Sequence, residues 1–115
     1  MTAQLKKDTW TDVCQLDDLV PESGVAVRLG KTQIALFYWP KTGEVFALGN
    51  TDPFSSANVI ARGIVGDVQG KRVVASPLYK QHFCLETGQC LEDDAVSLMS
   101  WPARLEEGQV LIQQP

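Results

Sequence analysis

Short stretches of alternating or continuous apolar residues, separated by turn residues, run along most of this chain. Alternation of apolar and polar positions, together with β-branched and aromatic residues, indicates strands rather than helices. The segment Gln33–Trp39 is long and apolar enough for a strand that is buried over most of its length. We predict strands over Trp10–Val13, Val25–Leu29, Thr32–Tyr38, Val45–Leu48, Arg72–Ala75, Phe83–Leu85, Ser97–Trp101 and Gln109–Gln113.

Turn residues separate these strands, and helix signals are few. Turns are predicted at Leu29–Lys31, Lys41–Gly43, Thr87–Gly88 and Glu107–Gly108. Asp17–Pro21 allows one helical turn at most, because proline disfavours helix at the residue before it. A turn or short helix is predicted over 55–61, capped by Ser55 or Ser56. The pattern predicts an all-β fold, a small antiparallel barrel or sandwich.

Composition places the chain among ordinary single domains. It has 115 residues, 44% of them hydrophobic, with three Trp and four Phe. At this length one core holds a fold without disulfides or metal. We expect the polar residues 1–8 to form a flexible N-terminus and residues 9–113 to form one domain.

Charge and cysteine content exclude several classes of function. A net charge of −4 argues against nucleic acid as a partner. No apolar run approaches the roughly 20 residues that span a bilayer, and no signal peptide is evident, so we expect no membrane partner. The cysteines Cys14, Cys84 and Cys90 cannot all pair, which favours reduced thiols and a cytoplasmic location.

Two segments, Asn50–Phe54 and Ala75–Phe83, are arranged like the two halves of an iron–sulfur site. A Rieske [2Fe–2S] centre needs two thiolates on one iron and two imidazoles on the other. They come from a Cys-x-His pair on one loop and a Cys-x-x-His pair on another. The corresponding positions here are Asp52, Phe54, Ser76 and Tyr79, none of which is Cys or His.

The order of these motifs, from about Trp10 to about Ile112, resembles the small subunit of bacterial assimilatory NAD(P)H-dependent nitrite reductase, a Rieske-like domain without the cluster ligands. The shared motifs include Asn-x-Asp-Pro-Phe, Ala-Arg-Gly-Ile-Val-Gly and Thr-Gly-Gln-Cys-Leu-Glu-Asp. The resemblance implies a Rieske-like fold with an inserted two-loop subdomain at about residues 50–91.

The same resemblance implies a function. This chain would be a non-catalytic subunit of a cytoplasmic enzyme that reduces nitrite to ammonia in nitrogen assimilation. Its partner would be a large subunit that carries FAD, a [4Fe–4S] cluster and sirohaem, while this chain itself binds no cofactor. Two alternatives stay open: a stand-alone protein-interaction module, and a Rieske-type ferredoxin that carries electrons.

The residues at the former ligand positions favour packing over metal binding. Asp52 and Ser76 offer two oxygen atoms, fewer than calcium or magnesium needs. We expect Phe54 and Tyr79 to fill the space between the two loops, and Asp52 and Ser76 to accept hydrogen bonds from backbone amides.

Other candidate chemistry is weak. His82 and Cys84 would share one face of a strand, but with Cys90 they supply only three zinc ligands at an atypical spacing. We interpret the cysteines as small hydrophobic residues. Neighbouring carboxylates, as at 93–94 and 106–107, point to opposite faces of an extended chain. We therefore predict no catalytic residues in this chain.

The tips of the two loops are the candidate surface for docking a partner. Aromatic residues beside a basic edge are typical of interface anchors. Packing of Phe54 against Tyr79 is the alternative, and both roles can hold at once. The candidate docking residues are Pro53, Phe54, Leu78, Tyr79, Lys80 and Gln81.

We predict that the purified chain binds no iron, because cluster iron must be held by thiolates or neutral imidazoles. Metal analysis and visible absorption after anaerobic reconstitution check this. Near two irons per chain, with the absorption of a cluster, would contradict it.

Overall fold

The computed structural model describes residues 10–113, and over this range the chain is built from short strands joined by turns. Its helical elements are two single-turn 3-10 helices, η1 and η2. In chain order the elements are β1 (Trp10–Gln15), η1 (Leu16–Asp18), β2 (Gly24–Leu29), β3 (Thr32–Trp39), β4 (Glu44–Gly49), η2 (Ile60–Arg62), β5 (Ile64–Val68), β6 (Lys71–Ala75), β7 (His82–Cys84), β8 (Ser100–Trp101), β9 (Ala103–Glu106) and β10 (Gln109–Gln113).

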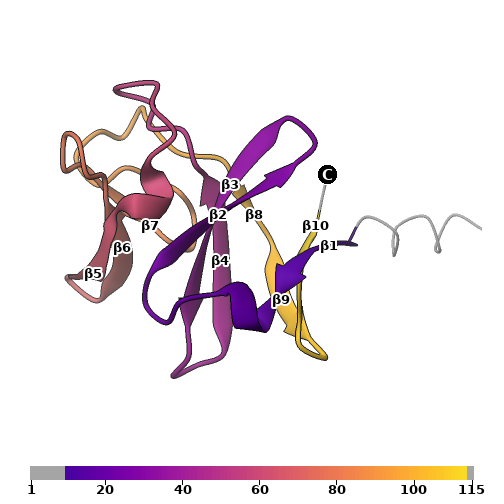
Figure 1. The fold of residues 1–115 in the computed structure, drawn as a ribbon. Coiled ribbons are helices and arrows are strands. Elements are labelled where there is room, and N and C mark those ends of the chain that lie inside the picture. The colour runs from indigo at the N-terminus through magenta and orange to yellow at the C-terminus, as the bar shows by residue number, and fades with distance from the viewer. Residues whose placement is uncertain (1–9, 114–115) are drawn as a thin grey trace, which may run out of the picture.

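Three antiparallel sheets make up the fold (Figure 1). The central sheet has the strand order β2-β3-β4-β8. The end sheet, β1-β10-β9, joins the first and last strands, and the hairpin sheet, β5-β6-β7, lies on the other side of the molecule. The all-β prediction is confirmed, and the described residues form no closed barrel.

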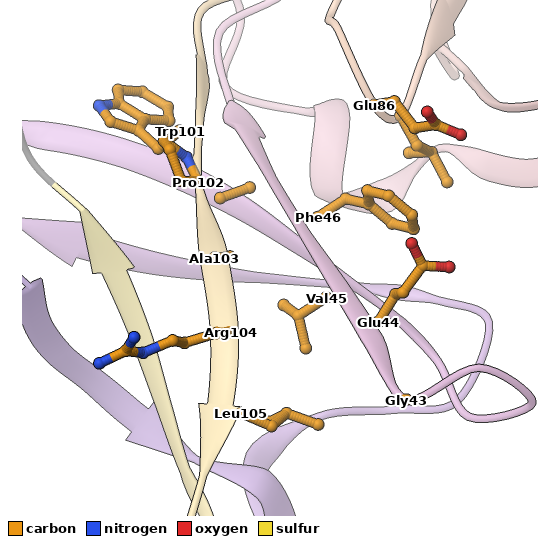
Figure 2. Close-up of a pocket in the computed structure, with 12 residues that line it drawn as sticks. Gly43, Glu44, Val45, Phe46, Glu86, Trp101, Pro102, Ala103, Arg104 and Leu105 are labelled. Carbon is orange, nitrogen blue, oxygen red and sulfur yellow. The ribbon is translucent and has the colours of Figure 1, made fainter.

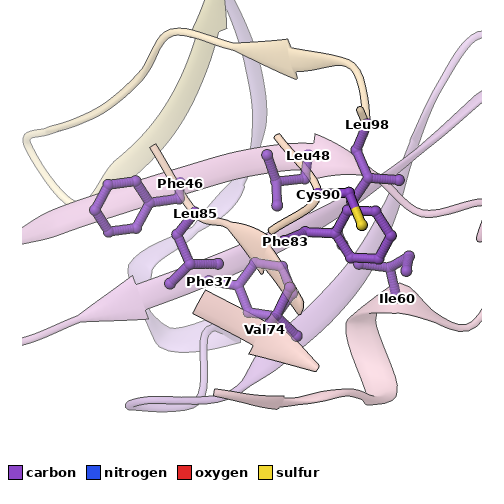
Figure 3. Packing of buried hydrophobic residues seen from close by; sticks show 10 residues of the cluster. Phe37, Phe46, Leu48, Ile60, Val74, Phe83, Leu85, Cys90 and Leu98 are labelled. Atoms are coloured by element: carbon purple, nitrogen blue, oxygen red, sulfur yellow. The ribbon is translucent and has the colours of Figure 1, made fainter. Parts of the chain in front are cut away.

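Strands β3 and β4 are buried on both faces. Ala35 pairs with Leu48 and Phe37 with Phe46, and these side chains face the hairpin sheet. Their neighbours along the strands, such as Leu36 and Ala47, face the end sheet instead. The first core, shown in Figure 3, consists of Ala35, Phe37, Phe46, Leu48, Ile60, Val74, Phe83, Leu85, Cys90 and Leu98. The second consists of Leu19, Ile34, Leu36, Val45, Ala47, Val110 and Ile112.

Arg72 of β6 ties the hairpin sheet to the central sheet. Its guanidinium donates to Glu44 Oε1 at 2.6 Å and to Glu86 Oε1 at 3.0 Å. The same group lies over the rings of Phe46 and Trp39, at 4.8 and 5.6 Å from their centroids. The hydrogen bond from Arg72 is the main cause that holds the pKa of Glu44 below its usual value.

Most predicted strands are confirmed to within a few residues, with three differences. Strands β5 and β9 were not predicted, because Gly66 interrupts the first apolar run and Pro102 precedes the second. The predicted strand 97–101 is wrong over its first half. There the backbone of Leu98 bonds to Gly88 instead of to the central sheet.

One of the two predicted helical segments differs from the structure. Leu16–Asp18 forms the expected single turn. Over 55–61, the predicted serine cap is wrong: helix η2 starts later, after Val59, and has no side-chain cap from its own N-cap residue. Asn50 supplies the bonds instead, since its Oδ1 accepts from Ala61 N–H at 2.7 Å and its backbone carbonyl accepts from Ile60 N–H at 3.1 Å.

The expected flexible N-terminus, residues 1–8, lies outside the described residues. Within 10–113, neither helix has the length and apolar character to cross a membrane.

We predict that Arg72→Ala destabilises the fold by about 1–2 kcal/mol, since it removes partly exposed ion pairs and stacking on two rings. Urea unfolding measures the loss. Arg72→Lys keeps the charge but not the planar fork, so it should recover only part of the stability. Arg28→Ala, at an exposed position of β2, is the control. An Arg72→Ala variant as stable as the control would contradict this role.

Candidate functional site

A hydrogen bond joins the two loops at the former ligand positions. Asp52 lies in the loop after β4 and Ser76 in the loop between β6 and β7. Ser76 Oγ donates to Asp52 Oδ2 at 2.5 Å, and both residues are almost fully buried. Sequence analysis placed both residues on facing loops but missed this bond. We call it the Asp52–Ser76 bridge.

Backbone bonds close each loop around the bridge. In the first loop, Asp52 N–H donates to Ala57 O, and Asp52 Oδ1 accepts from Phe54 N–H, both at 2.8 Å. In the second, Ser76 N–H donates to Gln81 O at 2.9 Å and Ser76 Oγ accepts weakly from an amide two residues on. The expected side-chain bonds to turn amides are therefore present.

The two aromatic residues behave differently from each other. The ring of Phe54 lies against that of Phe83, with centroids 6.4 Å apart and planes tilted by 43°. Tyr79 is 60% exposed. The expectation that both rings fill the space between the loops is thus wrong for Tyr79, because the Asp52–Ser76 bridge spans that space.

This arrangement does not fit a [2Fe–2S] cluster. The side chains at the four positions are a carboxylate, a phenyl ring, a hydroxyl and a phenol. Both carboxylate oxygens of Asp52 already accept hydrogen bonds. Cluster irons are held by thiolate sulfur and imidazole nitrogen, and neither is present at these positions.

The candidate zinc ligands His82, Cys84 and Cys90 do not come together either. His82 and Cys84 share a face of β7, but Cys90 is opposite Phe83 and lies in the first core. His82 Nδ1 is instead 2.6 Å from Glu92 Oε2. Among residues 10–113 the structure brings together no three His, Cys, Asp or Glu side chains that suit a metal ion.

Local contacts shift the ionisation of this region. Burial alone would raise the pKa of Cys84, but hydrogen bonds from Thr87 and from the Glu86 backbone together outweigh it and lower the pKa. Burial raises the pKa of Cys90, which is in keeping with a hydrophobic role. Burial would also raise the pKa of Glu92, but bonds from the His82 amide and ring hold it below its usual value.

A surface hollow of about 430 Å³ lies between β4 and β9 (Figure 2). The carboxylates of Glu44 and Glu86 lie on one side of it, with Phe46 between them, while Arg104 points away. Both carboxylates accept bonds from Arg72. The hollow therefore offers no free acid–base pair to a substrate.

The predicted docking residues lie together at the loop tips, and five of the six are exposed. Gln81 is partly buried, and its Oε1 lacks a hydrogen-bond partner among the described residues. Lys80 is exposed and has a positive φ of 64°, an uncommon backbone conformation for a residue other than glycine.

Comparison with known proteins identifies the family. The family model described as a Rieske-like [2Fe–2S] domain matches residues 9–113. The nitrite reductase (NADH) small subunit of Escherichia coli is 42% identical over 104 residues, which are 90% of this chain and 96% of that one. The NMR structure of the E. coli protein NirD has a TM-score of 0.83 at 42% identity, over 91% of this chain and 96% of the other.

Two further relatives differ in length or in identity. In Klebsiella oxytoca, a stretch 40% identical to 90% of this chain makes up 11% of the nitrite reductase [NAD(P)H] large subunit. A ferredoxin of Sphingomonas yanoikuyae B1 shares the fold, with a TM-score of 0.71 at 24% identity over 91% of this chain and 98% of that one. The chain thus belongs to the Rieske-like family and, within it, to the small subunits of nitrite reductase, an oxidoreductase.

Proposed function

We propose that this chain is the non-catalytic small subunit of a cytoplasmic NAD(P)H-dependent nitrite reductase. The enzyme reduces nitrite to ammonia for nitrogen assimilation. The chemistry takes place on the large subunit with FAD, a [4Fe–4S] cluster and sirohaem, and this chain docks on it. The three cysteines are unpaired, which fits a reducing compartment.

The observation that carries the proposal is the Klebsiella oxytoca relative. A domain like this one is a separate chain in E. coli and part of the large subunit in K. oxytoca. Covalent linkage holds two parts at a high effective concentration, so selection tolerates a fusion most readily where the parts already bind each other. That relation supports association of this chain with a large subunit.

A non-catalytic role agrees with how the polar groups are used. His82, the one histidine, pairs with Glu92. Asp52 is bound by Ser76 within the loops. Catalytic acids and bases need contact with the substrate, and these groups are occupied by contacts within the chain.

The former cluster site then has a structural role and supports a surface. The Asp52–Ser76 bridge holds the two loops together where a metal centre would join them. Beyond it, Phe54, Leu78 and Tyr79 form an exposed apolar tip with Lys80 at its edge. We propose this loop tip as a docking region, since buried interfaces favour aromatic anchors with charges at the rim.

A ferredoxin role is the alternative that shares this fold. It requires a redox centre at the loop tips, and the four side chains there do not fit one. A colourless protein that accepts no electron from dithionite would exclude it.

We predict that Ser76→Ala destabilises the fold by about 1–3 kcal/mol, because a buried carboxylate oxygen of Asp52 loses its partner. Urea unfolding with Ser97→Ala as the exposed control checks this, and the control should stay within about 0.5 kcal/mol of wild type. Equal stability of the two variants would show that the bridge contributes nothing.

Copurification tests the subunit role. Tagged wild-type chain should retain the large subunit, and Lys80→Glu should weaken the complex in a salt-dependent way, because a reversed charge at an interface rim slows association. Lys41→Glu, in the turn between β3 and β4, is the control. If tagged wild-type chain retains no large subunit, the subunit role is wrong. If Lys80→Glu binds as the control does, docking at the loop tip is wrong.

A further inference from the structure

Apolar side chains lie on both faces of the hairpin sheet, whereas an antiparallel sheet with one face in water commonly places polar residues on that face. Residues directly opposite each other in an antiparallel pair share a face. Val65, Val74 and Phe83 are opposite one another across β5, β6 and β7, and they pack in the first core. The outer side, or outer face, of the sheet therefore carries the alternate residues: Ile64, Gly66, Val68, Lys71, Val73, Ala75, His82 and Cys84. Of these, Ile64 and Lys71 are exposed, whereas Val73 at the centre is covered and only 2% exposed.

The segment after β7 extends this outer face. Leu91 N–H donates to His82 O at 2.8 Å, and Cys84 N–H donates to Gln89 O at 2.9 Å. Because Cys90 is opposite Phe83 and points into the core, its neighbour Leu91 lies on the outer side beside His82.

The outer face is open at its edge. Ile64 is 78% exposed, more than any other large hydrophobic side chain among residues 10–113. A Cβ placed on Gly66 would meet no atom within 4 Å. A surface hollow of about 580 Å³ opens beside Lys71, Cys84 and Leu91. The exposed apolar part of this face is therefore its β5 edge, at Ile64.

The surroundings of the outer face match the make-up of an interface. Ile64 pairs with Ala75, which directly precedes the second loop and its exposed Leu78. Polar and charged side chains lie on this face and beside it: Lys71, Glu86 and Asp94 line the hollow, and His82 contacts Glu92. An apolar centre with a charged rim is typical of protein–protein interfaces.

We propose that the outer face of the hairpin sheet is the main contact surface for the large subunit, with Ile64 as its apolar anchor. This inference rests on the proposed function and adds to it a surface beyond the loop tip. The K. oxytoca relative points to the large subunit as the occupant rather than to a second copy. Trp10 and Gln113 are partners in the end sheet, across the molecule from the hairpin sheet, so a covalent connection at either end leaves the outer face free (Figure 1).

The test measures binding of the purified full-length chain to the large subunit, by calorimetry or interferometry. Ile64→Lys should weaken binding at least tenfold, and Ile64→Thr, which keeps a β-branched residue in the strand, should weaken it less. Val20→Lys is the matched control, because Val20 is an exposed apolar residue away from the hairpin sheet. Thermal unfolding of all variants should match wild type, since Ile64 is mostly in water.

The outcomes separate the two proposals. Failure of the wild-type chain to bind the large subunit would overturn the proposed function. Binding by wild type with Ile64→Lys and Ile64→Thr both within twofold of Val20→Lys would overturn this inference alone. Analytical sedimentation tests whether a second copy of this chain occupies the face. If wild type is a dimer that Ile64→Lys dissociates, and binding to the large subunit is unchanged, the face joins two copies of this chain. The inference is wrong in that case too.

Discussion

Burial of the β3–β4 pair on both faces is the constraint on which the rest of the fold depends. One face of this pair presents Phe37 and Phe46 to the hairpin sheet, and the other presents Leu36 and Ala47 to the end sheet. A sheet that is apolar on two sides needs a layer on each side. Two further sheets supply these layers, and each is small because it has to cover only one face.

The strands of the central sheet were predicted well from the sequence, because a long apolar run such as Gln33–Trp39 in a short domain indicates a buried strand. Long-range contacts and the strands of the outer sheets were predicted less well. Contacts that join residues far apart in the chain, such as Arg72 with Glu44, leave no mark in a local pattern. Strand β5 was missed for a similar reason: Gly66 interrupts its apolar run, and the strand is defined by its pairing with β6.

The candidate site was predictable in its positions but not in its contacts. The resemblance to the Rieske pattern placed Asp52 and Ser76 on two loops. That the two side chains bond to each other depends on how the loops approach in the folded chain, where Phe54 of the first loop also packs on Phe83 of β7. A single buried hydrogen bond thus occupies the place where a metal centre would hold several ligands. It joins the loops without supplying redox chemistry.

The pairing of Trp10 with Gln113 has a consequence for how this domain is inherited. Because Trp10 and Gln113 lie side by side in one sheet, insertion of the domain into a longer polypeptide would not require its layers to rearrange. Joining the ends with a short linker and opening the chain at the turn after Trp39 would give a circularly permuted protein with the same three sheets. Gene fusion and fission are the natural counterparts of that rearrangement.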